Sequence, residues 1–480
     1  MRYQVLIIFV FFIFSCEKQE EEIPKNVLII CIDDLRPELK SFGANYIKSP
    51  NIDALANKGM KFTNHFVNAP SCGPSRYTFL TGQYGLQYRR DSNAALFSRS
   101  EDQLQTSKKF DPSMPEWFKQ NGYTTVSVGK VSHHPGGRGG DNWDNDSIIE
   151  MPGAWNKHIM PVGSWKTPRG AMHGLAYGQV RTPDHRDVME SVDDLDTSYP
   201  DGLIAKEGLN QIEKLAAAKK PFFLAIGLIK PHLPFGVPKK YLDMYEGVEI
   251  SEIQHPEKPE GETTWHPSGE FMKYNRNGKD PRTDNEFAME LKRYYAACVS
   301  YADKHVGDIL KKLKDTGADK NTIVVLWGDH GWHLGEHAIW GKHSLFEESL
   351  QSPLIIYNPE MNENGQEIDA IVESLDVFPT LSEWCNLPNP EFADGKSLVP
   401  VIKNKEVYSR VAVAYTSGAT TIRTSKYRFT EKRGGTLELY DHVNNPDETI
   451  NIANENPEVV KELKQMLNDK LDEKAFNRNP

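Results

Sequence analysis

The chain has 480 residues, of which 38% are hydrophobic and 26% are charged, and its formal net charge is −11. This length suffices for one large domain and a smaller one, and the acidic balance argues against a nucleic-acid-binding or general polyanion-binding surface. The five cysteines have no regular spacing, which argues against a disulfide framework and against a cysteine-based zinc site.

The N-terminus is predicted to be a targeting segment. Arg2 precedes an apolar run over residues 5–14, which has secretory length and is too short for a good transmembrane span. Residues 13–16 resemble a bacterial lipobox, so residues 1–16 are interpreted as a lipoprotein signal peptide with Cys16 lipidated. Residues 17–25 form an acidic tether similar to those of Bacteroidetes surface lipoproteins. We expect a lipid anchor in a bacterial outer membrane, facing the periplasm or the medium. Plain cleavage and an ordinary solvated linker are the alternatives.

Five continuous apolar runs predict strands buried on both faces of a sheet: residues 26–32, 124–128, 222–226, 322–327 and 354–357. Helical patterns separate them at residues 114–121, 203–218, 287–315 and 377–384. This alternation predicts an α/β domain around a large, mainly parallel central sheet.

Two stretches, residues 136–200 and 247–284, show no clear element, which is typical of functional loops or insertions. The last part of the chain changes character, with short antiparallel strands predicted at 411–415, 420–423, 427–430 and 438–440 and an amphipathic helix at 457–472. We therefore divide the mature chain into a main domain at residues 26–400 and a small C-terminal α+β subdomain at residues 401–480.

Polar side chains follow four of the predicted strands: Asp33 and Asp34, then Lys130 and His133, then Lys230 and His232, then Asp329 and His330. Ligands bind outside the carboxyl ends of the strands in open α/β sheets, so these groups are expected to gather at one site. The three aspartates are hard oxygen ligands that suit Ca²⁺ or Mg²⁺, and His330 is a candidate further ligand. For Asp33 and Asp34 alone, a helix cap or a solvated turn is the alternative.

The segment that begins at Cys72 is predicted to start a helix. Pro74 fits the first helical position, and Gly82 ends the helix. Residue 72 would then lie at a helix N-terminus, where backbone N–H groups and the helix dipole favour an anion. The alternative is a buried cysteine before an ordinary helix.

Residues 72–82 fill every fixed position of the pattern C-x-P-S-R-x-x-x-L-[ST]-G, and in this the chain resembles the type I sulfatases. Residues 33–37, 129–133, 230–232, 329–337 and 340–342 are similar to the iduronate-2-sulfatase branch of that family. The resemblance extends from residue 26 to residue 385 and covers the C-terminal subdomain only loosely. It implies an alkaline-phosphatase-like sandwich fold and the hydrolysis of sulfate esters.

In the type I sulfatases a maturation enzyme converts the motif cysteine to Cα-formylglycine (3-oxoalanine), whose hydrate attacks the sulfate ester. Carried over to this sequence, the resemblance implies that one Ca²⁺ is bound by Asp33, Asp34, Cys72 in its modified form, Asp329 and His330. It implies that Arg76 holds the hydrate and that Lys130 and Lys342 neutralise the sulfate oxygens. His232 would protonate the leaving oxygen, and His133 would accept the proton from the hydrate. His134 is the alternative base, although the spacing from Lys130 favours His133.

The resemblance further implies a sulfated glycan substrate, either an algal polysaccharide such as ulvan or a glycosaminoglycan with a uronate 2-sulfate. Aromatic and basic side chains of the first long insertion either contact sugar rings and carboxylates or pack within the insertion: Trp143, Trp155, Trp165, Arg169, His173, Arg181 and His185. Two other functions are open: a phosphonate monoester or phosphodiester hydrolase of the same superfamily, and a non-catalytic surface lipoprotein that binds sulfated glycans.

Overall fold

The computed structural model describes residues 24–88, 90–106, 109–140, 148–261, 263–361, 365–404 and 410–476. The predicted signal peptide, the lipobox with Cys16 and most of the acidic tether lie outside these residues, as does Trp143. In the part of the chain that is described, no helix combines the length and the apolar character needed to cross a bilayer.

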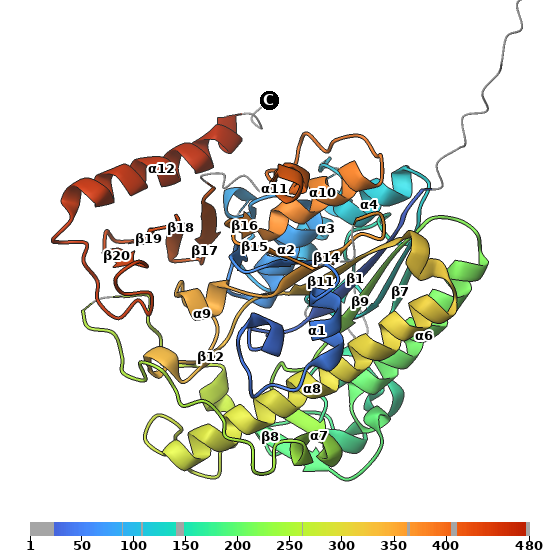
Figure 1. The fold of residues 1–480 in the computed structure, drawn as a ribbon, viewed down its shortest axis with the longest axis horizontal. Helices are drawn as coiled ribbons and strands as arrows, with labels where there is room; N and C mark the ends of the chain where they lie inside the picture. The colour runs from blue at the N-terminus through green and yellow to red at the C-terminus, as the bar shows by residue number, and fades with distance from the viewer. Residues whose placement is uncertain are drawn as a thin grey trace, which may run out of the picture.

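A mixed eight-stranded sheet lies at the centre of the described structure, in the order β15-β2-β14-β11-β1-β9-β4-β7 (Figure 1). Its strands are β1 (Asn26–Ile32), β2 (Met60–Phe62), β4 (Thr124–Gly129), β7 (Lys157–Ile159), β9 (Phe222–Leu228), β11 (Thr322–Gly328), β14 (Leu354–Tyr357) and β15 (Gln366–Ile368). The five strands from β11 to β7 are parallel, whereas β14 is antiparallel to both of its neighbours. The prediction of a mainly parallel sheet is confirmed.

Helices cover both faces of this sheet because β1 is apolar on both sides (Figure 1). Leu28 and Ile30 pack in one core with helices of the first layer, and Val27 and Ile29 pack in a second core on the other face. The first layer holds α1 (Pro50–Ala56), α6 (Pro200–Ala217) and α8 (Asn285–Asp315), and the second holds α2 (Cys72–Thr81), α3 (Ala95–Gln105), α4 (Met114–Gln120) and α10 (Val377–Trp384). Each fully buried aliphatic side chain stabilises this sandwich by about 1.5–3 kcal/mol.

The two long stretches without predicted elements contain short elements and loops. Residues 136–200 include β5 (Arg138–Gly139), β6 (Ile148–Ile149), β7, α5 (Pro168–Met172) and β8 (Met189–Val192). β8 pairs with β10 (Phe235–Pro238), which precedes α7 (Lys239–Asp243). The described residues of the 247–284 stretch contain one 3-10 turn, Phe271–Lys273.

The C-terminal part forms a four-stranded antiparallel sheet of β17 (Ala412–Tyr415), β18 (Ala419–Arg423), β19 (Tyr427–Lys432) and β20 (Leu437–Asp441). The helix α12 (Pro457–Phe476) packs on this sheet and follows α11 (Val399–Asn404) in chain order. The predicted α+β subdomain is confirmed, and its boundary at residue 401 stays a prediction. Short pairs of strands, β3 (His65–Phe66) with β16 (Val372–Glu373) and β12 (His333–Leu334) with β13 (Trp340–Gly341), lie outside the main sheet, as does α9 (Glu347–Leu350).

Candidate active site

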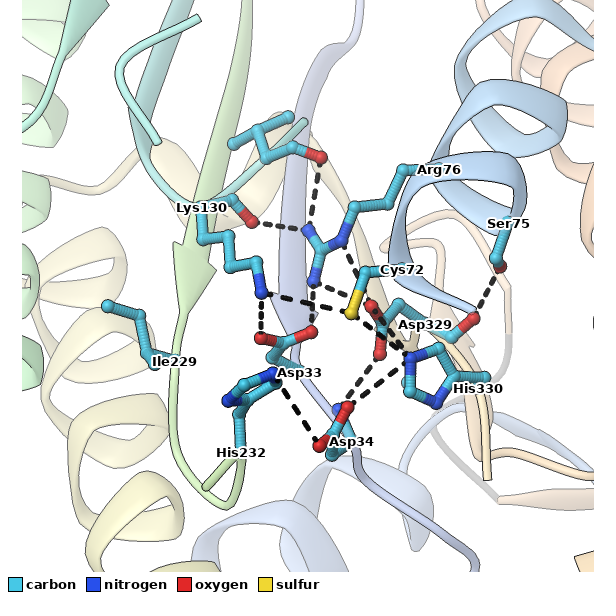
Figure 2. A network of polar contacts seen from close by, with 12 residues as sticks. Asp33, Asp34, Cys72, Ser75, Arg76, Lys130, Ile229, His232, Asp329 and His330 are labelled. Atoms are coloured by element: carbon cyan, nitrogen blue, oxygen red, sulfur yellow. Dashed lines mark hydrogen bonds and ion pairs between the residues drawn. The ribbon is translucent and has the colours of Figure 1, made fainter. Parts of the chain in front are cut away.

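The carboxyl ends of four parallel strands deliver the predicted polar residues to one place, as Figure 2 shows. Asp33 and Asp34 follow β1, and Asp329 follows β11, its neighbour in the sheet. The register pairs Ile32 with Gly328, so the backbone N–H of Asp34 reaches Oδ1 of Asp329 at 2.9 Å. The gathering that the strand pattern predicted is therefore present in the structure.

Cys72 is the first residue of α2, two residues earlier than the start predicted at Pro74. Pro74 is tolerated because the first N–H groups of a helix have no partner within the helix. Gly82 ends the helix in the left-handed region with φ +67°. Gly73, which the sequence pattern left variable, fits only as glycine, because a Cβ atom there would lie 2.2 Å from Cα of Asn93.

The sulfur of Cys72 lies among nitrogen atoms from distant parts of the chain. It is 3.2 Å from Nζ of Lys342, 3.8 Å from Nζ of Lys130 and 3.3 Å from Nε2 of His330. The side chain is 1% exposed, and this burial raises the pKa of the Cys72 thiol well above its usual value. The unmodified residue is therefore a neutral thiol with little nucleophilic character.

Buried acceptor atoms face one another beside Cys72. Nδ1 of His330 lies 2.9 Å from the carbonyl of Gly331, to which it donates, so Nε2 carries the lone pair. That Nε2 lies 3.3 Å from Oδ1 of Asp34 and 3.5 Å from Oδ2 of Asp329. Oδ2 of Asp34 is buried and has no hydrogen-bond partner.

Possible metal ligands gather beside Cys72, and their ligand atoms lie within 4.8 Å of one another in two overlapping sets: Asp33, Asp34, Cys72 and His232, and Asp33, Cys72, Asp329 and His330. Hard oxygen donors of this kind fit a divalent cation.

The carboxylates of this cluster differ in their electrostatics. Burial disfavours the charged form of Asp33, but the surrounding positive charges, of which Lys130 contributes most, together outweigh it and hold the pKa of Asp33 well below its usual value. Burial together with the charges of Asp33 and Asp329 raises the pKa of Asp34 well above its usual value, although Lys342 lies 2.7 Å away. The negative charge is thus only partly compensated by the basic side chains, which leaves a place for a bound cation.

Arg76 donates four hydrogen bonds beneath this cluster and forms ion pairs with two of its aspartates. Nε donates to Oδ2 of Asp329 at 3.0 Å, and Nη2 contacts Asp33 at 3.0 Å and Asp329 at 2.9 Å. Nη1 donates to the carbonyls of Lys130 and Val131. In the structure these contacts orient two candidate metal ligands, and the predicted contact between Arg76 and the modified residue 72 stays a prediction.

Two family models match this chain: Sulfatase over residues 25–387, and the C-terminal part of N-sulphoglucosamine sulphohydrolase over residues 335–476. The chain belongs to the sulfatase family. It is a sulfuric ester hydrolase.

This sulfatase is similar to curated relatives over most of its length. It is 33% identical to a sulfatase of Formosa agariphila, with 91% of this chain and 84% of the relative covered. It is 32% identical to iduronate 2-sulfatase of Homo sapiens, with coverages of 76% and 70%, and 27% identical to an ulvan-active sulfatase of Formosa agariphila, with coverages of 96% and 83%. The solved phosphonate monoester hydrolase of Agrobacterium radiobacter superposes with a TM-score of 0.75 at 21% identity, covering 94% of this chain and 96% of that one, which shows a common fold.

A cavity of about 560 Å³ opens in front of Cys72 in the sulfatase. Its walls include two predicted histidines, His133 and His232, and many residues that motif analysis did not identify: Asn93, Met172, Arg186, His266, Gly269, Glu270, Lys273, Tyr274 and His343. These residues come mostly from the two long stretches for which no regular element was predicted. Their position depends on how those loops fold back onto the sheet, and only the unusual length of the loops was visible in the sequence.

His232 lies between the carboxylates of Asp34 and Glu270 at the cavity wall. Its Nδ1 donates to the carbonyl of Leu233 at 2.7 Å, so Nε2 is the free ring nitrogen. Nε2 lies 3.9 Å from Oδ2 of Asp34 and 3.8 Å from Oε1 of Glu270. Burial lowers the pKa of His232 well below its usual value, so the ring is neutral in the absence of substrate.

The two adjacent histidines after β4 have different surroundings. His133 lines the cavity and its Nδ1 has no hydrogen-bond partner, whereas Nδ1 of His134 lies 2.8 Å from Oε1 of Glu150. Lys230 donates to the carbonyls of His232 and Pro234 and so supports the turn rather than the cavity wall.

The insertion residues divide between packing and the cavity. Trp155 and Trp165 are 7% and 3% exposed and pack inside the fold, which is the packing alternative for both. His173 and Arg181 line the cavity, whereas Arg169 and His185 are not among its lining residues. Arg181 is held by a 2.7 Å hydrogen bond from Nη1 to the hydroxyl of Tyr274.

Proposed function

We propose that this sulfatase removes sulfate from an acidic sulfated glycan, with residue 72 converted to formylglycine and one Ca²⁺ bound beside it. The observation that carries the proposal is the basic cavity over Cys72. The cavity is lined by four basic side chains, Arg181, Arg186, Lys273 and Lys342, and Glu270 is the one carboxylate among its lining residues. The whole chain, by contrast, has a net charge of −11. Basic groups concentrated in one cavity of an acidic protein favour an anionic substrate.

The chemistry of the donor set supports calcium. Asp33, Asp34, Asp329 and His330 would hold the ion together with residue 72. Oxygen-rich sites suit Ca²⁺ or Mg²⁺, and the crowded, fully buried set here leaves little room for the several waters that Mg²⁺ usually keeps. When bound, the ion would polarise a sulfate oxygen and stabilise negative charge as the ester bond breaks.

The position of residue 72 supports its conversion. A buried thiol with a raised pKa is a weak nucleophile, and the hydrated aldehyde of formylglycine would supply a nucleophilic oxygen at the same place. Residue 72 also lies at the N-terminus of α2, where the helix dipole favours negative charge. This part of the proposal requires a formylglycine-generating maturation enzyme in the host.

Four side chains of the protein have roles in the proposed reaction. Lys130 and Lys342, which both lie within 4 Å of the Cys72 sulfur, would neutralise the sulfate oxygens. His232 would donate a proton from Nε2 to the leaving sugar oxygen, because Asp34 and Glu270 stabilise the protonated ring. His133 would accept a proton from the side chain of residue 72, and its placement in the cavity favours it over His134.

The relatives and the cavity together support a uronate-containing glycan. The similar proteins include an iduronate 2-sulfatase and an ulvan-active sulfatase. The planar guanidinium groups of Arg181 and Arg186 are suited to a carboxylate or a neighbouring sulfate on the same sugar chain. We therefore propose either ulvan fragments or a glycosaminoglycan uronate 2-sulfate as substrate.

We also propose that the enzyme is an outer-membrane lipoprotein, anchored through Cys16 and facing the periplasm or the medium. The support comes from the apolar run and the lipobox-like residues in the sequence. Labelling of the native protein with a fatty acid analogue, lost in a Cys16→Ser variant, tests the anchor. Export without label in the wild type would leave plain cleavage as the explanation.

The first experiment is to co-express the full chain with a maturation enzyme and to incubate it with ulvan and heparan oligosaccharides, measuring released sulfate. Release that disappears in Cys72→Ala is expected from one of the two glycans. An intact mass that shows formylglycine, combined with no release from either glycan and cleavage of an aryl phosphonate instead, would favour the phosphonate hydrolase. Binding of the glycan without turnover by the converted enzyme would favour the non-catalytic alternative.

A further inference from the structure

A second cluster of possible metal ligands lies among residues that have no part in the proposed reaction. One ligand atom each from His255, His337 and Glu348 lies within 4.8 Å of the others. His255 comes from the loop at residues 247–284, His337 from the turn between β12 and β13, and Glu348 from α9. The His337 side chain is fully buried, and the His255 and Glu348 side chains are 13% and 12% exposed.

The hydrogen bonds of His337 leave one of its lone pairs facing a carboxylate. Nε2 lies 2.9 Å from the backbone carbonyl of Asp447, which can only accept, so Nε2 carries the proton. Nδ1 of the neutral ring is then an acceptor, and it lies 3.6 Å from Oε2 of Glu348. Neither atom has a hydrogen-bond partner in the structure. Two buried acceptors at this separation require a positive charge between them.

No lysine or arginine in the described part of the chain forms an ion pair with Glu348. The ion-pair partners of Glu348 are His255 at 2.9 Å, His337 at 3.6 Å and His333 at 4.0 Å. Both ring nitrogens of His333 already have partners, the carbonyl of Glu336 and the hydroxyl of Ser344. The positive charge must therefore come from a bound ion or from a second proton on a histidine.

A neighbouring cluster of histidine and glutamate side chains differs because an arginine compensates its charge. Glu347, His442 and Glu448 also bring their ligand atoms within 4.8 Å of one another. There Arg428 pairs with both carboxylates, so the charge is compensated by the protein itself. The His337 cluster instead repeats the arrangement of His330, in which one ring nitrogen donates to a main-chain carbonyl and the other faces carboxylates.

We propose that His255, His337 and Glu348 bind a structural transition-metal ion, for which Zn²⁺ is the best match. Two imidazoles and a carboxylate are a usual zinc ligand set. Imidazole nitrogens select against Ca²⁺ and Mg²⁺, so this site would take a different ion from the aspartate cluster. Oδ2 of Asp447 lies 3.7 Å from Nδ1 of His255 but outside this ligand set, so water would complete the coordination.

The ion would join the loop at residues 247–284 to the segment that holds His337 and Glu348. His255 belongs to the same loop as Glu270, which lines the cavity. Asp447, whose carbonyl fixes the His337 ring, belongs to the C-terminal subdomain. Zinc bound here would fasten the cavity loop to the rest of the protein, so its loss is expected to lower stability more than turnover.

The test uses the full chain, equilibrated with ZnCl₂ in excess CaCl₂, then desalted and measured for both metals by mass spectrometry. The wild type is expected to retain about one zinc per chain, and His337→Gln and Glu348→Gln to retain far less. His442→Gln, the matched control from the arginine-bearing cluster, is expected to keep its zinc. Asp34→Asn is expected to lose calcium and keep zinc, which separates the two sites.

A second measurement needs no variant. Zinc is expected to raise the melting temperature of the wild type and to be withdrawn competitively by a chromophoric chelator. A wild type that retains no zinc and does not compete with the chelator would overturn the proposal and assign the charge to a second proton on His255 or His337. Equal zinc in the wild type and in folded His337→Gln and Glu348→Gln variants would also overturn it.

Discussion

Nζ of Lys342 lies 3.2 Å from the sulfur of Cys72 and 2.7 Å from Oδ1 of Asp34, so one ammonium group contacts both the candidate nucleophile and a candidate metal ligand. Asp34 and the neighbouring carboxylates raise the pKa of Lys342 well above its usual value, although burial opposes this. The side chain is therefore charged throughout the working pH range and fixed in place before substrate binds.

Lys342→Met is expected to lower kcat for released sulfate by about 10²–10³-fold, because it removes a preorganised charge at the sulfate position. Lys273→Gln, which alters the cavity wall without a contact to Cys72, is expected to raise KM and to leave kcat nearly unchanged. Steady-state kinetics of the two variants on one glycan measures the difference. Similar losses of kcat in both would contradict the role given to Lys342.

His232→Asn is expected to slow the release of a sugar alcohol by about 10²–10⁴-fold, because the leaving oxygen then lacks its proton donor. An aryl sulfate with an acidic phenol needs no such proton, so its hydrolysis is expected to fall much less. The ratio of the two rates, measured for wild type and variant, isolates proton donation from general damage. An equal loss on both substrates would reject His232 as the acid.

Arg76→Ala is expected to lower the free energy of unfolding by about 3–5 kcal/mol, because it removes a buried cation that pairs with the carboxylates of both Asp33 and Asp329. Urea denaturation monitored by fluorescence measures this loss. Arg282→Ala is the matched control, because Arg282 pairs with Asp280 at the surface, where such a pair contributes less than about 1 kcal/mol. Comparable losses in the two variants would contradict the importance of the buried contacts.

His305 is expected to contribute to the loss of folding stability at acid pH. It is 3% exposed, neither ring nitrogen has a hydrogen-bond partner, and burial lowers the pKa of His305 to about 4. In the unfolded chain the His305 ring takes up a proton near its ordinary pKa of about 6.5, whereas in the folded protein it does so only near pH 4. Between these two pH values the unfolded state binds more protons, so the free energy of unfolding decreases as the pH falls from about 6.5 to about 4. The loss due to this residue approaches about 3 kcal/mol.

His305→Phe is expected to flatten the pH dependence of unfolding in that window, because the unfolded variant takes up no proton at this position. Urea midpoints measured between pH 7 and pH 4 for the two proteins give the comparison. Parallel curves for wild type and variant would show that His305 does not contribute.

The sequence predicted the framework of the site because that framework depends on local patterns. Apolar runs located β1, β4, β9 and β11, and the ends of parallel strands placed Asp33, Lys130 and Asp329 together. Glu270 and Arg186 could not be found in this way, because they reach the cavity from loops whose course is set by non-local contacts. The acceptors of Arg76 could not be predicted either, because a motif gives residues without their contacts.

The burial of Cys72 also imposes an order of events on the making of this enzyme. Its surroundings include Asp34 and Asp329, which are separated by 295 residues, and Lys342, which is synthesised later still. During synthesis Cys72 is therefore exposed for most of the time, and it becomes buried only when β11 pairs with β1. Under the proposed conversion of residue 72, a maturation enzyme would have to act during that interval, because folding buries the cysteine. The yield of converted enzyme would then depend on the relative rates of oxidation and folding, and slower folding would raise it.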